Sequence, residues 1–308
     1  MKILVTGGAG FIGSHLVEYF QGRAEIRVLD DLRSGFRHNL AGLEHQFIAG
    51  SILDRELVRQ AVTGVDFVFH LAAMVSVPES MTNPGECHEI NTTGTLVMLE
   101  EAARAQVKKL VFSSSAAIYG DNPASPKTET MLPEPKSPYA RTKLAGEVLC
   151  EQFAREGKLP TACLRYFNVF GPRQNPRRQY AAAVPIFIER ALRHEPLTVH
   201  GDGGQTRDFI FVQDIAAAND FFATRSPATG LFNLAHGKST SIQQLADDIC
   251  HLTGSRSEMI HAPERAGDVK HSLASVEKLR ATGFTPAASF EDGMKATIES
   301  FRRLEPIN

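Results

Sequence analysis

The chain has 308 residues, of which 43% are hydrophobic and 22% are charged. This composition is typical of a folded globular protein and argues against a wholly disordered or collagen-like chain. Lys and Arg number 33 against 35 Asp and Glu, so the formal net charge is −2. Such a balance argues against a dedicated nucleic-acid-binding protein, which usually carries a strongly basic face.

Two further features bear on the compartment and on metal binding. The amino-terminal apolar run, residues 3–5, is too short for a signal-peptide core, and no run reaches the roughly 18 apolar residues of a membrane span. The four cysteines show no CxxC spacing, which is the usual sign of a zinc or redox site. We therefore expect a cytoplasmic protein with buried free thiols, no metal and no membrane association.

Short apolar runs alternate with segments of helical spacing over the first half of the chain. The predicted strands are residues 3–5, 26–29, 67–69, 110–112 and 162–164, and the predicted helices are residues 12–20, 55–62, 91–105 and 139–153. Continuous apolar runs are typical of strands buried on both faces. The alternation predicts the α/β class, as a Rossmann-like, doubly wound parallel sheet with helices on both faces.

The pattern changes after residue 168, where prolines become frequent. Helices are predicted over residues 181–192, 212–224, 242–253 and 290–302. We expect a first domain over residues 1–167 and a smaller mixed α/β domain over residues 168–308, with some segments returning to the first domain. The second domain would lie over the carboxyl ends of the strands, where open α/β sheets bind their ligands.

A glycine-rich turn follows the first predicted strand. Gly7, Gly10 and Gly13 separate that strand from a helix, and Asp30 lies 20 residues after Gly10 at the end of the second strand. Glycines let the backbone approach a pyrophosphate at a helix amino terminus, and the carboxylate binds a ribose diol. Because Asp31 would repel a 2′-phosphate, the pattern favours NAD over NADP.

A second group of residues combines a tyrosine, a lysine and a run of serines. Tyr139 and Lys143 are four residues apart on a predicted helix, so their side chains share one face. The residues 113–115 are all serines and end the preceding strand, at the edge of the sheet where a substrate would lie. A tyrosine with a pKa near 10 is a poor base at neutral pH, and a nearby ammonium and a cationic nicotinamide would lower that value.

Together these motifs resemble the extended short-chain dehydrogenase/reductase family, and within it the UDP-hexose 4-epimerases. The resemblance covers residues 2 to about 275 and rests on Gly7-x-x-Gly10-x-x-Gly13, Asp30, Phe112-Ser113-Ser114-Ser115, Tyr119-Gly120, Tyr139-x-x-x-Lys143 and Leu164-Arg165-Tyr166-Phe167-Asn168.

The resemblance implies a reaction in which NAD is used and regenerated in each turnover. Tyr139 would remove the proton of the sugar 4-hydroxyl, Ser115 would bridge or relay it, and Lys143 would lower the tyrosine pKa and hold the nicotinamide ribose. Hydride would leave C4 to give a 4-keto sugar, which rotates about its pyrophosphate and takes the hydride back on its other face. The net result would be inversion at one carbon of a UDP-sugar.

The resemblance also assigns binding residues. Those implied for the cofactor are Gly7, Gly10, Phe11, Ile12, Gly13, Asp30, Asp31, Ser51, Ile52, Leu71, Ala72, Ala73, Asn91, Ser113, Tyr139, Lys143 and Tyr166. Those implied for the UDP-sugar are Ser115, Tyr139, Asn168, Ala182, Ala183, Val184, His200, Arg207, Arg265, Asp268 and Ser272. Paired guanidinium groups suit a diphosphate.

The chain departs from the family pattern at three positions. Ser51 replaces an aspartate that commonly contacts adenine, and His200 stands where an aromatic side chain often stacks on uracil. Ser272 stands where some epimerases carry a bulky tyrosine near the sugar. The small side chain would leave room for an N-acetyl group, so we expect UDP-GlcNAc and UDP-GalNAc as substrates beside UDP-glucose and UDP-galactose.

Several alternatives remain open. Ala116 and Ala117 stand where the related 4,6-dehydratases carry an acid/base pair, which disfavours dehydration. A UDP-uronate 4-epimerase, a decarboxylase and a non-catalytic NAD(H) sensor are the others. Nucleic-acid binding, for which the candidate residues are Arg173, Arg177, Arg178 and Tyr180, is the weakest alternative.

The resemblance also bears on assembly. The helices predicted over residues 91–105 and 139–153 carry the apolar residues Leu96, Leu99, Leu144, Val148 and Leu149. In this family, the corresponding helices commonly pair across a two-fold axis as a four-helix bundle, so we expect a homodimer. Packing against the sheet of the same subunit would explain part of this apolar stripe equally well.

Overall fold

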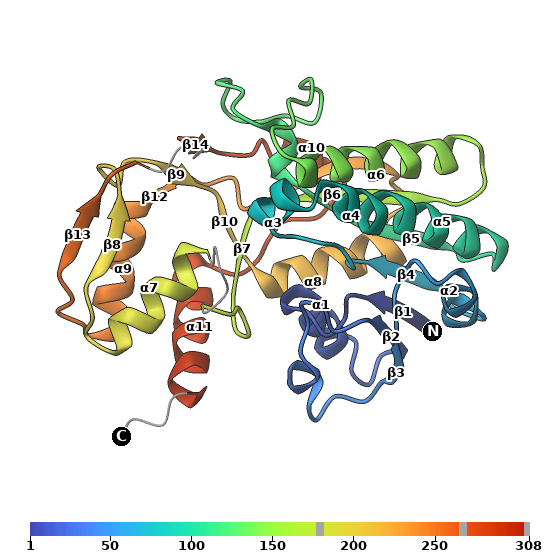
Figure 1. Ribbon diagram of the computed structural model, residues 1–308, viewed down its shortest axis with the longest axis horizontal. Helices are drawn as coiled ribbons and strands as arrows, with labels where there is room; N and C mark the ends of the chain where they lie inside the picture. Colours follow the sequence, from blue (N-terminus) through green and yellow to red (C-terminus); the bar gives the residue numbers. More distant parts are fainter. Residues whose placement is uncertain (177–181, 265–269, 305–308) are drawn as a thin grey trace.

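A seven-stranded parallel sheet forms the centre of the computed structural model, which describes residues 1–176, 182–264 and 270–304 (Figure 1). The strand order is β3-β2-β1-β4-β5-β6-β11. The strands are β1 Lys2–Thr6, β2 Glu25–Asp30, β3 Gln46–Ala49, β4 Phe67–His70, β5 Lys109–Ser115, β6 Thr161–Tyr166 and β11 Gly230–Leu234. The predicted doubly wound sheet and its five predicted strands are confirmed.

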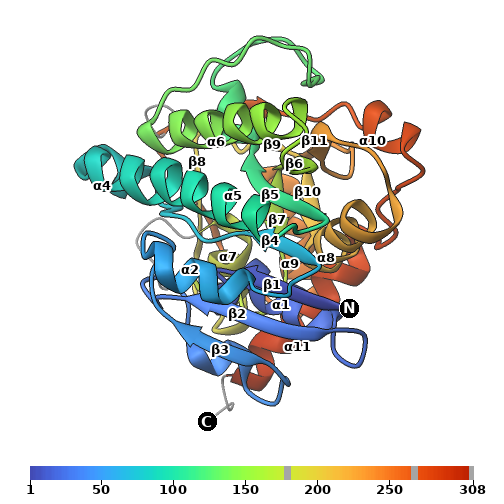
Figure 2. The same cartoon turned by 90° about the vertical axis from the view of Figure 1, so that its right-hand side faces the viewer.

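Helices cover both faces of this sheet because successive strand residues point to opposite sides. Ile3 and Val5 pack in the same core as residues of α1 Phe11–Tyr19 and α8 Val212–Asp220, whereas Leu4 packs in another core with residues of α2, α5 and α6. The last three helices are α2 Arg55–Val62, α5 Gly94–Arg104 and α6 Pro138–Arg155, and they lie beside one another in Figure 2.

The strand order reverses beside β1, which pairs with β2 on one side and with β4 on the other. Helices that leave β1 and β4 therefore run to opposite faces, and a crevice opens between them at the carboxyl ends of the strands. The short helices α3 Val77–Thr82 and α4 Pro84–His88 follow β4 and continue through a π-helical turn, η2 Glu89–Thr93, into α5. The predicted helix over residues 91–105 is thus confirmed, with a start in this irregular segment.

A second lobe lies to the left of the sheet in Figure 1 and has its own apolar core. Its helices are α7 Ala183–Leu192, α9 Ile242–Thr253 and α11 Phe290–Leu304. One small sheet pairs β8 Leu197–His200 with β13 Met259–Ala262, and a second pairs β7 Asn168–Phe170 with β10 Phe209–Phe211. A third consists of β9 Thr206–Arg207, β12 Thr240–Ser241 and β14 His271–Ser272. The late helices predicted from the sequence are present, although residue 181 lies outside the described residues.

Two late segments return to the first lobe. Strand β11 extends the main sheet by pairing with β6, and α8 packs against α1. The remaining short helices are η1 Arg37–Leu40, η3 Ala116–Tyr119, η4 Phe221–Arg225 and α10 Glu277–Ala281. Across the described residues, no helix combines the length and the hydrophobicity that a bilayer span requires. The boundary at residue 167 remains a prediction.

Candidate active site

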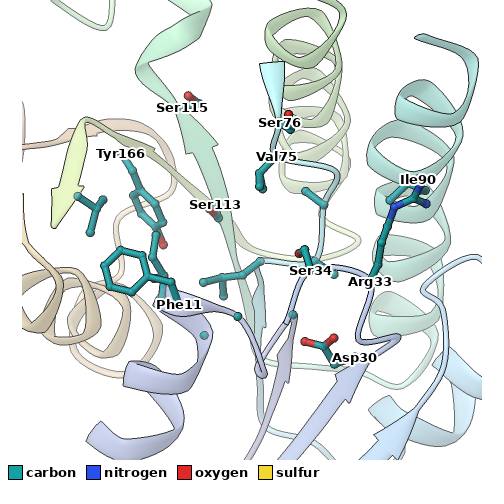
Figure 3. Close-up of a pocket in the computed structure, with 18 of the residues that line it drawn as sticks. Phe11, Asp30, Arg33, Ser34, Val75, Ser76, Ile90, Ser113, Ser115 and Tyr166 are labelled. Atoms are coloured by element: carbon teal, nitrogen blue, oxygen red, sulfur yellow. The ribbon is translucent and has the colours of Figure 1, made fainter. Parts of the chain in front are cut away.

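A cavity of about 610 Å³ opens at the carboxyl ends of β1, β2, β4 and β5 (Figure 3). Its wall is formed by the turn between β1 and α1, the loops after β2 and β4, the end of β5 and the start of α6. This is the crevice that the reversal of strand order creates, so the fold itself places the cavity.

The glycine-rich turn forms the floor of the cavity, and its glycines are required by close backbone contacts. A Cβ atom on Gly7, whose φ is +68°, would lie 2.8 Å from the Ala72 nitrogen, and one on Gly13 would lie 2.2 Å from the Gly7 oxygen. Helix α1 begins at Phe11 with no side-chain cap. Its first amides therefore lack a side-chain acceptor and can bind a phosphate.

Asp30 ends β2 and is 7% exposed. Its carboxylate accepts hydrogen bonds from the Ala9 amide at 2.9 Å and from the Leu32 amide at 2.8 Å. Burial raises the pKa of Asp30, and these two bonds oppose that rise. The fixed carboxylate and the glycine turn fit the diol and the pyrophosphate of a dinucleotide, which is the arrangement predicted from the sequence.

The three predicted catalytic residues converge on the same cavity. Ser115 ends β5, whereas Tyr139 and Lys143 lie one turn apart near the start of α6. The helix is fixed at this end because Ser137 caps it, accepting a hydrogen bond from the Ala140 amide. The Lys143 ammonium donates to the Ser113 carbonyl at 2.7 Å, which ties the helix to the strand.

Burial dominates the electrostatics of this group. Burial raises the pKa of Tyr139, although a hydrogen bond with the Ser115 side chain acts to lower it. Burial also lowers the pKa of Lys143 to about 8. The Lys143 nitrogen lies 5.9 Å from the centre of the Tyr139 ring. The resemblance implied that Lys143 helps to lower the pKa of Tyr139. In the protein chain alone, burial instead raises that pKa.

A second tyrosine, Tyr166, also lines the cavity but is held differently. Its hydroxyl is paired with the Asn219 amide, at 3.2 Å from the oxygen and 2.8 Å from the nitrogen. Burial raises the pKa of Tyr166 strongly. Tyr139 is therefore the better placed of the two for proton transfer.

A buried ion pair lies directly behind the serine run and was not expected from the sequence. Glu147, one turn after Lys143, accepts two hydrogen bonds from Arg165, at 2.8 and 2.7 Å, and one from the Ser114 hydroxyl at 2.6 Å. Ser114 and Arg165 face each other in the register of β5 and β6. The pair thus joins two strands to the helix that carries Tyr139 and Lys143.

A second cavity of about 560 Å³ adjoins the first, since Val169 and Ala182 line both. Six residues predicted for the UDP-sugar line it, namely Asn168, Ala182, Ala183, Val184, His200 and Arg207. Ser272 lies opposite Arg207 in the pairing of β14 with β9 but is not part of the cavity wall. Arg265 and Asp268, together with Arg177, Arg178 and Tyr180, lie outside the described residues.

Most residues predicted for the cofactor line the first cavity, and two do not. The lining includes Gly7, Gly10, Phe11, Ile12, Gly13, Asp30, Asp31, Ile52, Leu71, Ala72, Ala73, Ser113, Tyr139, Lys143 and Tyr166. The Ser51 hydroxyl instead accepts from the Leu53 amide at 3.2 Å. The Asn91 amide group binds both main-chain groups of Met74, so it supports the loop after β4 from behind.

Sequence reasoning missed one side of the cavity. This side is formed by the segment after β2, with Arg33, Ser34, Phe36 and Asn39, by the start of α3, with Val75, Ser76, Val77 and Pro78, and by Ile90 of η2. A signal was present in part, because Ser76 followed by a proline and by Glu79 is typical of a helix start. The loop residues carry no comparable periodic pattern.

Comparisons with known proteins identify the family. The model of the NAD dependent epimerase/dehydratase family matches residues 3–235. The UDP-N-acetylglucosamine 4-epimerase of Methanobrevibacter ruminantium, solved with UDP-N-acetylmuramic acid, is 38% identical over 99% of both chains, with a TM-score of 0.95. The UDP-glucose 4-epimerase of Thermotoga maritima, solved with UDP-glucose, is 40% identical over 99% of both chains, with a TM-score of 0.93.

A third solved structure concerns the cofactor. The UDP-glucose 4-epimerase of Thermus thermophilus, solved with NAD, is 38% identical over 98% of this chain and 99% of that one, with a TM-score of 0.89. The predicted cofactor, NAD, agrees with the description of the family and fits the glycine turn and Asp30. The chain therefore belongs to the NAD dependent epimerase/dehydratase family, and its cofactor is NAD.

Proposed function

We propose that the protein is an NAD-dependent epimerase that inverts C4 of a UDP-hexose through a 4-keto intermediate. The observation that carries this proposal is the convergence of Ser115, Tyr139 and Lys143 on a cavity that adjoins a second one lined by Asn168 and Arg207. One cavity would hold the dinucleotide and the other the UDP-sugar, with the reacting carbon where they meet.

The chain's own residues account for the proton transfer. The Tyr139 hydroxyl would take the proton of the sugar 4-hydroxyl, with the Ser115 hydroxyl as bridge. Because burial raises the pKa of Tyr139, base catalysis at neutral pH requires positive charge beside the phenol, and Lys143 is one source. NAD, bound by the glycine turn and Asp30, would supply the acceptor for the hydride of the sugar C4 and a second positive charge.

The charge distribution favours epimerisation over dehydration. Elimination of water from a 4-keto sugar needs a carboxylate or a similar acid/base group beside the sugar. Among the described residues that line the two cavities, the carboxylates are Asp30 and Asp31, and both lie at the end of β2. Ala116 and Ala117, which follow Ser115, cannot transfer protons.

The product identifies the reaction. An epimerase converts the UDP-sugar into an isomer of equal mass without added cofactor, whereas a dehydratase product has lost water and a decarboxylase product has lost carbon dioxide. Mass spectrometry and NMR of the product therefore distinguish these members of the family, and a dehydrated product would overturn the proposal. Absence of turnover with retained NAD would favour a non-catalytic sensor.

For the substrate class we propose UDP-N-acetylhexosamines in addition to UDP-glucose and UDP-galactose. Ser272 does not line the second cavity, but it is small and is the cross-strand neighbour of Arg207, which does, and this supports the choice. A Ser272→Tyr variant should reduce kcat/KM for UDP-GlcNAc far more than for UDP-glucose. Thr240, the other cross-strand neighbour of Arg207, offers a matched control in Thr240→Tyr. Full N-acetyl activity of Ser272→Tyr would contradict this part, and turnover of UDP-glucuronate would favour a uronate epimerase.

We also propose a homodimer formed by the outer faces of α5 and α6. Val148 is 55% exposed on α6, and Leu96, Leu144 and Leu149 are partly exposed. Leu99, by contrast, is fully buried inside the subunit and cannot contribute. Light scattering of the wild type and of Val148→Glu tests the proposal, since the wild type should be a dimer and the variant a monomer. A monomeric wild type would contradict it.

A further inference from the structure

An arginine lies in the loop after β2, three residues beyond Asp30, and lines the same cavity as that carboxylate. In dinucleotide-binding folds, an arginine near this position is the group that accommodates the 2′-phosphate of NADP. Figure 3 shows the side chain of this residue, Arg33, running toward Ile90 and away from the carboxylate of Asp30. A cation suited to NADP is therefore present in the chain but is turned from the ribose-binding group.

Two carboxylates hold Arg33 in this orientation. Its Nη1 atom lies 2.6 Å from Oε1 of Glu86, and its Nη2 atom lies 3.7 Å from Oε1 of Glu79. Glu79 belongs to α3 and Glu86 to α4, in the segment that follows β4, whereas Arg33 lies in the loop after β2. Pairing with Arg33 lowers the pKa of Glu86, which keeps that carboxylate ionised.

The pair is accessible enough to be exchanged for another anion. The side chains of Arg33, Glu79 and Glu86 are 37%, 43% and 44% exposed, and exposed ion pairs are individually weak. Arginine binds phosphate as it binds carboxylate, often through two parallel hydrogen bonds, so a phosphate can compete with one exposed carboxylate for the guanidinium. Two carboxylates that share the Arg33 guanidinium therefore hold it more firmly than either carboxylate would alone.

The other cationic side chains of the described cavity wall also have partners within the protein. Arg173 donates to the Asn39 carbonyl at 3.2 Å and is paired with Glu18, and Lys143 is bound to the Ser113 carbonyl. Asp30 and Asp31 add negative charge at the end of β2. A 2′-phosphate placed beside Asp30 would thus meet carboxylates and an arginine that is already paired.

We propose that Glu86, supported by Glu79, is a specificity-determining residue for the cofactor: by holding Arg33, it withholds the cation that a 2′-phosphate needs and adds to the preference for NAD set by Asp30. This inference rests on the cofactor site described above and not on the identity of the sugar. It assigns a role to the start of α4, which lies outside the glycine turn and the catalytic group.

The test is a comparison of nucleotide affinities on the full chain. The Asp30→Ser variant removes the main barrier to a 2′-phosphate, and NADP and NAD dissociation constants are measured for it alone, with Glu86→Gln, and with Glu86→Gln and Arg33→Ala together. Glu86→Gln should tighten NADP binding about tenfold, the effect of one charge-assisted hydrogen bond. Arg33→Ala should abolish this gain, and NAD affinity should differ little among these three variants, which all carry Asp30→Ser.

Matched controls separate the proposal from general charge effects. Glu56 pairs with Arg59 at 2.6 Å on α2, so Glu56→Gln removes the same kind of pair elsewhere and should leave NADP binding unchanged. If NADP affinity stays constant in Glu86→Gln, or rises equally without Arg33, the proposal is overturned. Should Asp30→Ser fail to fold, the same comparison is made with Glu86→Gln alone by competition of NADP against bound NAD. Since binding is measured, loss of epimerase activity does not affect the outcome.

Discussion

Lys143 donates a hydrogen bond of 2.7 Å to the main-chain carbonyl of Ser113, two residues before the serine that faces Tyr139. Together with the bond from Ser114 to Glu147, this contact ties the first turns of α6 to the end of β5. The helix and the strand are far apart in the sequence, and their junction brings the phenol, the ammonium and the serine hydroxyl to one cavity.

Tyr139→Phe should lose most turnover while retaining bound NAD and thermal stability. Loss of a general acid/base commonly costs about 10²- to 10⁴-fold in rate. Tyr166→Phe is the matched control, because the Tyr166 hydroxyl is held by Asn219 and should contribute far less. Steady-state rates and the NAD released on denaturation measure both effects, and equal losses in the two variants would contradict the assignment of Tyr139.

The pH dependence of stability should reveal the buried ammonium of Lys143. Burial lowers its pKa to about 8, whereas an unfolded lysine has a pKa of about 10.4. The folded state therefore binds fewer protons than the unfolded state between these values, so this residue's contribution to stability becomes more favourable as pH rises through that window.

Lys143→Met removes this titration. The free energy of unfolding of the cofactor-free wild type, measured relative to that of Lys143→Met, should rise between pH 8 and about pH 10. Denaturant titrations at several pH values provide the measurement. A constant difference across this window would show that the pKa of Lys143 is not depressed in the folded protein.

The ion pair of Glu147 and Arg165 should behave as a buried pair. Both side chains are nearly inaccessible, at 3% and 2% exposed. Glu147→Gln or Arg165→Met alone should cost about 3–5 kcal/mol, because each leaves one buried charge without its partner, whereas the double variant Glu147→Met/Arg165→Met should cost much less. Denaturant unfolding gives the coupling energy of the cycle.

An exposed pair provides the comparison for that cycle. Glu56 and Arg59 are 63% and 44% exposed, so Glu56→Gln should change stability by less than about 1 kcal/mol. If the single variants of Glu147 and Arg165 were equally mild, the pair would not hold β5, β6 and α6 together.

Gly13→Ala should reduce cofactor retention and stability together. The added Cβ would lie 2.2 Å from the Gly7 oxygen, so the phosphate-binding turn must shift. Gly85→Ala in α4 is the control, since its Cβ would meet no heavy atom within 4 Å and alanine favours helix by about 1 kcal/mol. Released NAD and the melting temperature report both variants, and normal cofactor content in Gly13→Ala would contradict the close packing of the turn.

The sequence predicted the strands that are buried on both faces, because each is a continuous apolar run. Strand β3 was missed since it lies at the sheet edge and its residues are only partly buried. Strand β11 was missed because its apolar run is short and is interrupted by Asn233, which is buried.

The residues of the candidate site likewise divide into those with a local sequence signal and those without one. The glycine turn, Asp30, Tyr139 and Lys143 were predicted because their chemistry depends on local spacing. Glu147 was missed although it is four residues after Lys143, because a lone glutamate on a helix is normally solvated and its partner Arg165 lies on another element. Arg33 and Glu86 were missed for the same reason, since they meet only in the folded chain.

The transfer of hydrogen at C4 offers the most direct test of the proposed function. The wild type is incubated in ordinary water, without added cofactor, with a UDP-hexose that carries deuterium at C4. We predict that the C4 epimer forms and keeps its deuterium at C4, because hydride leaves and returns within one site. Exchange of the label into water, or its appearance at C6 of a dehydrated product, would contradict the account.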